Sequence, residues 1–363
     1  MMTPREEIKA RALPPLLSRE EMRDILQREV YGYLPNPDFS LSVSEPTVVE
    51  ARYAVGNVEH SFVYLTVAVG AHTHTFRVDR LLHQDACKHP LIVYNNFHPE
   101  LKSQYFPTEE LSESDADFLI VYYRDVTSDD GDFTNGIAPL LLPSGQVEES
   151  DPGKIAMWAW TAMRVLDYGL GLAGTDAARV GVAGHSRLGK TALFAAMMDE
   201  RFTYVLSNAA GCAGDSLAHG NSGLGRSERD HLHGELIEDI TEAFPYWFCR
   251  RYRSYAEKNV SDTFDQHFLI GAIAPRYVLI GSCSEDHWAD PHSQYLCALA
   301  ASEAWERSGE CGLKAPDRYP DVGERHLDGR VGFYYLKMQH FMSRHGWNSF
   351  LQFIEKHSEN PYK

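Results

Sequence analysis

The sequence is short of basic residues and of long apolar runs, and each shortage excludes a class of protein. Its 34 lysines and arginines are outnumbered by 51 aspartates and glutamates, which gives a formal net charge of −17 at pH 7. Such a chain has no basic surface for phosphates, so we expect no nucleic-acid partner. The sequence also has no run of about 18 apolar residues, so we expect no membrane span.

Cysteine is scarce and scattered, with no C-x-x-C pair and no metal-ligand spacing. A chain of 363 residues does not need disulfides, so we expect free, buried thiols and no metal site. The N-terminus lacks the apolar segment of a signal peptide. We therefore expect a cytoplasmic protein, or a secreted or periplasmic one if a signal has been removed.

Short apolar runs alternate with helical patterns from residue 90 onward. The runs are residues 91–94, 117–123, 180–183, 204–207 and 277–281. Helical patterns lie between them, notably over residues 155–172 and 294–307. Continuous apolar strands separated by helices predict an α/β fold with a mostly parallel central sheet and helices on both faces.

The N-terminal region has a different pattern. Ser18 followed by Glu21 forms a capping box, which predicts a helix that ends near Val30. Residues 40–80 alternate apolar and polar side chains, which predicts antiparallel strands at one edge of the sheet. We expect one domain over 1–363, in which 1–85 form this helix and these edge strands and 86–363 form the core.

The stretch VGVAGHSRLGKTALFAAMM, residues 180–198, has the layout of a nucleophile elbow. An apolar strand, a G-H-S corner and a helical pattern follow one another, and such a turn lifts the hydroxyl of Ser186 above the sheet. The N-terminus of the following helix offers N–H groups to an oxyanion. The match to G-x-S-x-G is imperfect, because Leu188 occupies the second glycine position and the next glycine is Gly189.

Two cations follow Ser186 on a helix that such a fold normally buries. Burying a cation without a partner is energetically unfavourable, so we expect each of the two side chains to have a function. Arg187 comes directly after the nucleophile and is placed to reach an oxyanion, whereas Lys190 shares the helix face of Ser186 and could bind a polar substrate. The alternative is that Ser186 caps the helix and both cations pair with structural carboxylates.

A serine hydrolase of this fold orders its residues as Ser, then Asp or Glu, then His. The candidate acids follow the apolar run YVLIG of residues 277–281. They are Glu285, Asp286 and, as a weaker candidate, Asp290. The alternative is that these carboxylates cap the helix that starts near Pro291, a role that suits Asp290.

The base must come later in the chain, and four histidines qualify. His340 lies in a loop-like stretch before the last predicted helix, residues 347–356. We expect His326 to be exposed in a charged segment, His345 to cap the last helix and His357 to be solvated. These expectations favour His340.

The segment 215–239 is polar and rich in glycine, and it contains several histidines. This composition predicts a long surface loop. Long loops often shape substrate sites, so this segment is a candidate for selecting the substrate.

The string GHSRLGK resembles the G-[CH]-S-R-x-G-K elbow of the glucuronoyl esterases, carbohydrate esterase family 15. The similarity extends through DERFTYVLSNAAGCAG, GELIEDITEAFPYWFC, FDQHFLIGAIAPRYVLIGSCSEDHWADP and VGFYYLKMQHF, and covers the chain from about residue 90 to its end. The resemblance implies the α/β-hydrolase fold. It also implies hydrolysis of esters of the glucuronic acid carboxyl, including those that join 4-O-methylglucuronoyl groups on xylan to lignin alcohols.

The resemblance also implies residue roles. By it, Ser186 is the nucleophile, Arg187 helps to stabilise the oxyanion and His340 is the base. Three further positions, which in the family hold the hydroxyls and ring face of the uronate, match Lys190, Glu235 and Trp288. The implied partner is a uronic acid ester or a glucuronoxylan-derived oligosaccharide, and this chemistry needs neither a metal nor an organic cofactor.

The chain departs from the family in two places. Ala209 stands where many members have their acid, and Ala209 cannot orient a histidine. Some members use an acid in the E-D-x-W-A-D-P loop instead, so we assign the acid to Asp286, with Glu285 as the alternative. Residues 337–339 replace the usual glycine-rich turn before the base. These departures keep two alternatives open: a deacetylase or other carbohydrate esterase, and a uronate-binding pseudoenzyme.

Overall fold

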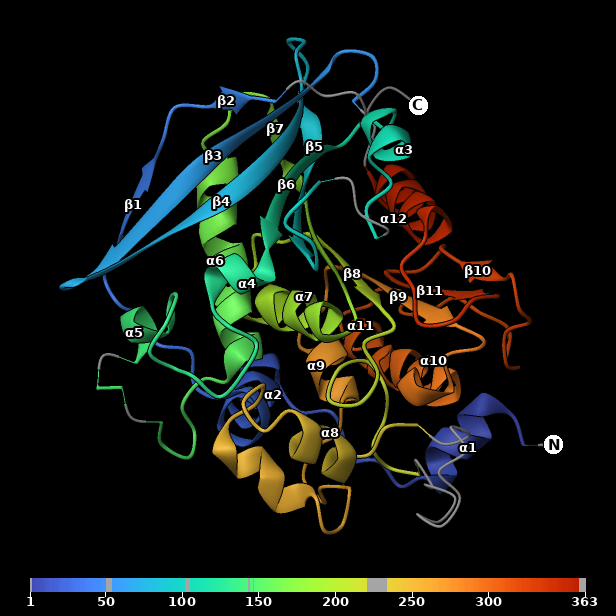
Figure 1. Cartoon of the computed structure of the whole chain (residues 1–363). Coiled ribbons are helices and arrows are strands. Elements are labelled where there is room, and N and C mark those ends of the chain that lie inside the picture. Colours follow the sequence, from blue (N-terminus) through green and yellow to red (C-terminus); the bar gives the residue numbers. More distant parts are fainter. Residues whose placement is uncertain are drawn as a thin grey trace.

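The chain is organised around one mixed sheet with helices packed against it (Figure 1). The computed structural model describes residues 2–49, 54–101, 105–142, 144–145, 147–220 and 234–358. The strand order is β1-β3-β4-β6-β5-β7-β8-β9-β11-β10, and β2 pairs with β3 outside this path.

The described elements have the following bounds. The strands are β1 (Ser40–Val43), β2 (Thr47–Val48), β3 (Val58–Val69), β4 (His72–His83), β5 (His89–Asn96), β6 (Asp117–Tyr122), β7 (Thr175–His185), β8 (Tyr204–Asn208), β9 (Tyr277–Cys283), β10 (Arg325–His326) and β11 (Val331–Leu336). The α-helices are α1 (Pro4–Ala10), α2 (Arg19–Leu26), α3 (Thr108–Ser112), α4 (Tyr123–Val126), α5 (Ala138–Leu141), α6 (Lys154–Gly169), α7 (Arg187–Met198), α8 (Ile237–Ala243), α9 (His267–Gly271), α10 (Pro291–Ala301), α11 (Glu303–Glu306) and α12 (Arg344–His357). Three short turns of other helix types are η1 (Gln27–Tyr31), η2 (Arg250–Tyr255) and η3 (His287–Ala289).

Strand direction divides the sheet into two parts. The neighbours β6, β5, β7, β8, β9 and β11 are all parallel. The strands β1 to β4 pair antiparallel with one another, and β4 joins them to β6. The prediction of a mostly parallel sheet with antiparallel N-terminal edge strands is therefore confirmed. Each of the five apolar runs lies in a parallel strand, except that the last residue of the run 117–123, Tyr123, begins α4.

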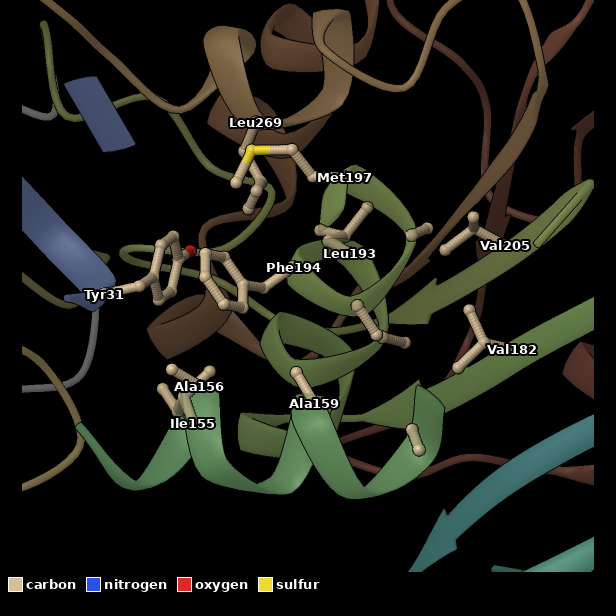
Figure 2. Close-up of a cluster of buried hydrophobic side chains, with 14 of the residues drawn as sticks. Tyr31, Ile155, Ala156, Ala159, Val182, Leu193, Phe194, Met197, Val205 and Leu269 are labelled. Atoms are coloured by element: carbon tan, nitrogen blue, oxygen red, sulfur yellow. The ribbon is translucent and has the colours of Figure 1, made fainter. Parts of the chain in front are cut away.

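Successive residues of a parallel strand pack into different hydrophobic cores, because their side chains alternate between the two faces of the sheet. Val182 of β7 belongs to a core that also holds Phe194 of α7 and Tyr31, whose ring centroids are 4.6 Å apart (Figure 2). The next residue, Ala183, belongs to the opposite core with Trp347 of α12. Both faces of the sheet are therefore covered by helices, which is why its strands read as continuous apolar runs.

Side-chain hydrogen bonds account for the ends of two predicted helices. Ser18 accepts a hydrogen bond from the amide of Glu21, whose carboxylate accepts one from the amide of Ser18, so the predicted capping box is confirmed. The helix predicted over residues 294–307 is divided at Ser302. The hydroxyl of Ser302 donates to the carbonyl of Ala298 at 2.9 Å, and this bond competes with the regular helix bonds.

The long surface loop predicted over residues 215–239 is wrong at both ends. Asp215 is fully buried, because its carboxylate accepts hydrogen bonds from the hydroxyl of Ser207 and the amide of Gln294 at 2.8 and 2.7 Å. At the other end, α8 begins before the predicted loop is complete. Residues 221–233 lie outside the described residues.

Composition-based expectations are met in part. All six cysteines are free thiols. The buried ones, as expected, are Cys212, Cys249, Cys283 and Cys297, whereas the expectation is wrong for Cys87 and Cys311, which are exposed. Within the part of the chain that the structure describes, no helix is long and apolar enough to cross a membrane.

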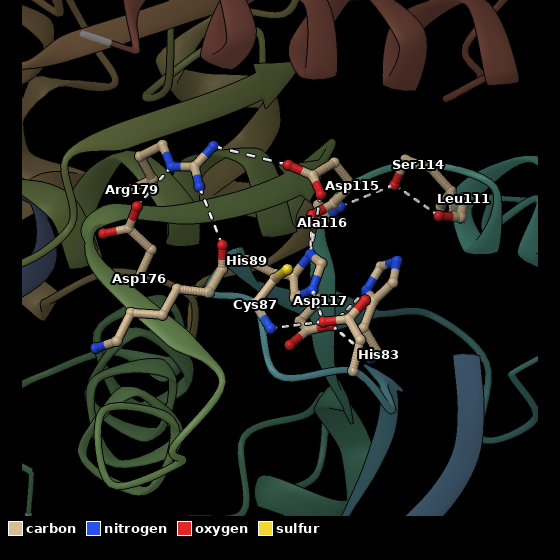
Figure 3. Close-up of polar contacts among 12 residues, drawn as sticks. His83, Cys87, His89, Leu111, Ser114, Asp115, Ala116, Asp117, Asp176 and Arg179 are labelled. Carbon is tan, nitrogen blue, oxygen red and sulfur yellow. Dashed lines mark hydrogen bonds and ion pairs between the residues drawn. The ribbon is translucent and has the colours of Figure 1, made fainter. Parts of the chain in front are cut away.

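Two stacked histidines join β4, β5 and β6 at the amino ends of the parallel strands (Figure 3). The ring centroids of His83 and His89 are 3.9 Å apart, and the two ring planes are nearly parallel. His83 contacts Asp117 at 2.8 Å, and His89 contacts Asp85 and Asp115 at 2.9 and 3.0 Å. Burial opposes a charge on His89, but these oxygen partners outweigh burial and raise its pKa.

This cluster predicts a pH-dependent contribution to stability. Because the pKa of His89 is raised on folding, its protonated form stabilises the fold below the unfolded pKa, and that stabilisation is lost as the pH rises through the folded pKa. We expect the free energy of unfolding, measured by urea titration, to fall between about pH 6 and 8, and His89→Gln to lessen that fall. The exposed His72 provides the control His72→Gln. A His89→Gln variant with the full pH dependence would contradict the prediction.

Candidate active site

Ser186 occupies a strained turn between β7 and α7. Its backbone has φ +58° and ψ −128°, a region that residues other than glycine rarely adopt, and its amide donates to the carbonyl of Asn208 at 2.8 Å. The strand and the helix approach closely here, because a Cβ atom on Gly184 would lie 1.9 Å from the carbonyl oxygen of Leu188. The first glycine of the elbow is therefore required by the close approach, whereas the buried Leu188 fills the core below.

The turn after β9 and the loop after β11 bring an acid to a histidine. Nδ1 of His340 lies 2.6 Å from a carboxylate oxygen of Asp286. Asp286 is almost fully buried, with a side-chain exposure of 4%, whereas that of His340 is 42%. Glu285 is exposed, and its backbone amide donates to the carbonyl of Met338. Of the two candidate acids, the structure places Asp286 behind the imidazole.

The other candidate histidines are held elsewhere. His326 lies in β10 and is largely buried, so the expectation that it is exposed is wrong. Ser343 caps α12 by accepting hydrogen bonds from its first amides, so the expectation that His345 is the cap is wrong. His357 contacts the carbonyl of Leu327 at 2.9 Å instead of being solvated. Asp290 caps α10, as its alternative reading predicted.

Arg187 is held by a carboxylate that the sequence does not single out. Its guanidinium pairs with Asp129, which is 4% exposed and lies in the loop after α4. Asp129 also accepts hydrogen bonds from the indole of Trp247 at 2.8 Å and the hydroxyl of Tyr123 at 3.1 Å. The same indole lies under the guanidinium, 4.4 Å from it, and Phe244 stacks on the indole. The alternative reading, in which this cation has a structural carboxylate, is therefore correct for Arg187, which still adjoins Ser186.

Lys190, Glu235 and Trp288 form one cluster. Lys190 is buried and donates to the carbonyl of Ala210, and burial lowers its pKa. Burial raises the pKa of Glu235 to about 7, while the charge of Lys190, a hydrogen bond with Trp288 and the charge of His340 act in the opposite direction. Trp288 is 41% exposed, so an open aromatic face adjoins two buried, oppositely charged groups. Such a cluster suits a ligand with a flat apolar face and several hydroxyls.

Further residues of the site carry no motif in the sequence. His185 precedes the serine, with its ring centroid 4.5 Å from that of His340, and Asn208 ends the next strand. The carboxylate of Asp215 holds the turn after β8 in place, because it accepts a hydrogen bond from the amide of Gly211. Of these residues, Asn208 has a signal in the sequence: it stands at the end of a predicted parallel strand, and the carboxyl end of such a strand lies beside the end of the neighbouring strand. Among the described residues, no group of acidic, histidine and cysteine side chains is arranged to hold a metal ion.

The order of these parts along the chain defines a class. A serine on a strand-to-helix elbow, a later acid and a final histidine, all at the carboxyl edge of a mostly parallel sheet, are typical of the α/β-hydrolase fold.

Comparisons with known proteins narrow this class to a family. The family model "Glucuronyl esterase, fungi" matches residues 147–309. The carbohydrate esterase MZ0003, from an unknown prokaryotic organism, is 34% identical over 239 residues, which are 65% of this chain and 52% of that protein. A 4-O-methyl-glucuronoyl methylesterase from Podospora anserina is 31% identical over 43% of this chain and 32% of its own. The chain thus spans about half the length of the first relative and a third of the second.

A solved structure matches over nearly the whole chain. A glucuronoyl esterase from Solibacter usitatus has a TM-score of 0.80 and 27% identity, and the match covers 93% of this chain and 91% of that one. In sequence and in fold the chain is therefore similar to the glucuronoyl esterases of carbohydrate esterase family 15.

The strained turn predicts an unusual order of stabilities. Ser186→Ala and Ser186→Gly both remove the hydroxyl, but only glycine relaxes a positive φ, which costs other residues about 1–3 kcal/mol. The greater entropy of unfolded glycine offsets about 0.5–1 kcal/mol of that gain. We expect chemical denaturation to find Ser186→Gly more stable than Ser186→Ala by about 1 kcal/mol. Equal stabilities, or a less stable glycine variant, would show that the turn is not strained.

Proposed function

We propose that the protein is a serine carboxylesterase that hydrolyses esters of glucuronic acid or 4-O-methylglucuronic acid, in glucuronoxylan-derived or related substrates. The observation that carries the proposal is the contact between His340 and Asp286 beside the elbow of Ser186. The names of the relatives, which include a 4-O-methyl-glucuronoyl methylesterase, support the substrate class. The residue roles below are part of the proposal.

In the first step, His340 takes the proton of Ser186 as the hydroxyl attacks the ester carbonyl. Asp286 fixes the tautomer of the imidazole and stabilises the imidazolium, because a buried carboxylate is poorly screened by water. His340 then gives its proton to the departing alcohol. Water hydrolyses the acyl-enzyme in a second cycle of the same proton transfers.

The oxyanion forms where α7 begins. The first helical amide belongs to Arg187, and amides in a first turn have no intrahelical partner. We assign a second donor to residues 95–98, at the end of β5 and directly after it, where this fold places such a donor. The guanidinium adds a permanent positive charge, and its ion pair with Asp129 keeps it beside the serine.

The uronate lies on the cluster of Lys190, Glu235 and Trp288. Its ring packs on the exposed indole, and its hydroxyls bond to the buried ammonium and carboxylate. This arrangement distinguishes a uronate from a small acyl group, since an acetyl ester has no hydroxyl for either charge. A general esterase would have no use for the three residues together.

The direct test compares two kinds of ester. We expect a higher kcat/KM for benzyl or methyl glucuronate than for p-nitrophenyl acetate, and a loss of about 10⁴-fold or more in kcat in Ser186→Ala. A preference for the acetate would replace the proposed substrate with that of a deacetylase or another carbohydrate esterase. If the unaltered protein and Ser186→Ala bound glucuronate but hydrolysed its esters equally poorly, the protein would be a uronate-binding pseudoenzyme.

A matched pair of variants tests the acid. Asp286→Asn keeps the shape of the side chain but holds the wrong tautomer of His340, so we expect kcat to fall by about 10³- to 10⁴-fold. Glu285→Gln makes the same change, from a carboxylate to an amide, at the exposed neighbouring residue. We expect its kcat to be within about twofold of that of the unaltered protein. Steady-state kinetics on one glucuronate ester measures both, and the reverse ranking would move the acid to Glu285.

A further inference from the structure

Asn208 lies between the nucleophile elbow and the loop that carries His340. Its backbone carbonyl accepts a hydrogen bond from the amide of Ser186 at 2.8 Å, and its side-chain nitrogen donates to the carbonyl of Phe341 at 3.1 Å. Phe341 directly follows His340. One buried residue is thus bonded to the amide of the serine and to the neighbour of the histidine.

Tyr334 of β11 fixes the direction of this amide. The hydroxyl of Tyr334 lies 2.5 Å from Oδ1 of Asn208. Burial raises the pKa of Tyr334 well above its ordinary value, so the phenol keeps its proton and donates it. The carbonyl of Phe341 can only accept, so the amide nitrogen must face Phe341 and the amide oxygen accepts from Tyr334.

The same nitrogen determines the tautomer of His185. It lies 2.7 Å from Nδ1 of His185, and because an amide nitrogen only donates, Nδ1 must accept and the ring proton must be on Nε2. The alternative is that Nδ1 donates to the carbonyl of Asn208 at 3.2 Å. That arrangement would set two N–H groups against each other across the shorter contact. We therefore assign the Nε2–H tautomer, in which the buried Nε2–H has no hydrogen-bond partner among the described residues.

His185 is enclosed beside the base. It is 1% exposed, and its ring centroid lies 5.1 Å from that of Tyr105. Burial lowers its pKa well below the ordinary value. The charges of His340, Arg187 and Lys190 add to this effect, and the carbonyl of Asn208 opposes it. His185 therefore remains neutral when the neighbouring His340 takes up a proton.

We propose that Asn208 is a positioning residue that holds the loop of His340 at the elbow and keeps His185 as the neutral Nε2–H tautomer. The first effect sets the approach of the base to Ser186. The second leaves a single imidazole able to receive the serine proton, and it prevents two cations from facing each other in a poorly screened site. The kinetic part of this inference depends on the proposed function, whereas the tautomer of His185 does not.

Three variants separate these effects from a loss of stability. Asn208→Asp still accepts from Tyr334 but cannot donate to Phe341, and it should draw the proton of His185 onto Nδ1. Asn208→Ala removes all the side-chain bonds. Ser282→Ala is the matched control, because Ser282 is buried in the adjacent β9 and donates one hydrogen bond, to Gln294 at 2.7 Å.

The tautomer is measured by NMR on protein labelled with ¹⁵N-histidine, with His185 assigned by the signals lost in His185→Gln. We expect the unaltered protein to show a protonated Nε2 and a bare Nδ1 that do not titrate between about pH 5 and 8. Asn208→Asp should show a protonated Nδ1. On a glucuronate ester we expect kcat to fall about 10- to 100-fold in Asn208→Asp and Asn208→Ala, with KM within about twofold. Ser282→Ala should keep its kcat.

The outcomes distinguish this inference from the proposed function. A His185 that titrates, or that carries its proton on Nδ1 in the unaltered protein, overturns the tautomer whether or not esters are hydrolysed. Equal losses of kcat in Asn208→Asp and Ser282→Ala, or a change confined to KM, overturn the positioning role. If the unaltered protein hydrolyses no ester, the proposed function fails, and the NMR result alone decides the inference.

Discussion

The close approach of β7 to the first turn of α7 is the constraint on which the site depends. A side chain at Gly184 would collide with the carbonyl of Leu188, so the chain can reverse here only without one. The reversal forces Ser186 into a positive φ and brings the unpaired amides of the helix to the edge of the sheet. Arg187 and Lys190 then follow on the same short helix, so one turn places a hydroxyl, an amide and two cations together.

The two cations of α7 are buried in different ways. Arg187 has a carboxylate partner and lies on an indole, so its charge is balanced and its plane is fixed. Lys190 donates to a backbone carbonyl and faces Glu235, whose pKa of about 7 reflects the cost of burying its own charge. A buried pair of this kind contributes little net stability, because desolvation offsets the Coulomb attraction. The proposed polar ligand would therefore give Lys190 a role beyond this small contribution to stability.

The proposed acid, Asp286, follows a different strand from the one at which the family resemblance places the acid in many members. Ala209 follows β8, where many members of the family carry the acid, and its amide donates to the carbonyl of Gly281 in β9. β8 and β9 are parallel neighbours, so their ends are separated by about 4.8 Å. A carboxylate on the turn after β9 can therefore serve the same imidazole as one after β8, and Asp286 contacts His340 from that turn.

Sequence patterns predict features that are formed by contiguous residues, but not contacts between residues from distant parts of the chain. The apolar runs, the elbow and the E-D-x-W-A-D-P turn are contiguous, so their elements could be predicted. Asp129 lies 58 residues from Arg187 and has no local signature, because its donors come from distant parts of the chain. Asn208 is indicated only by its place at the end of a strand, and its contact with Tyr334 comes from another strand. Asp215 was assigned to a surface loop because polarity alone cannot distinguish a solvated carboxylate from one enclosed by amide and hydroxyl donors. Asp286 is enclosed by other partners, because the amide of Ala289 donates to its carboxylate at 3.3 Å and Nδ1 of His340 lies 2.6 Å from it. In the proposed mechanism the carboxylate acts on the imidazole more strongly when it is shielded from water, whereas the imidazole has to be accessible to the substrate, and the exposures of the two side chains meet both requirements.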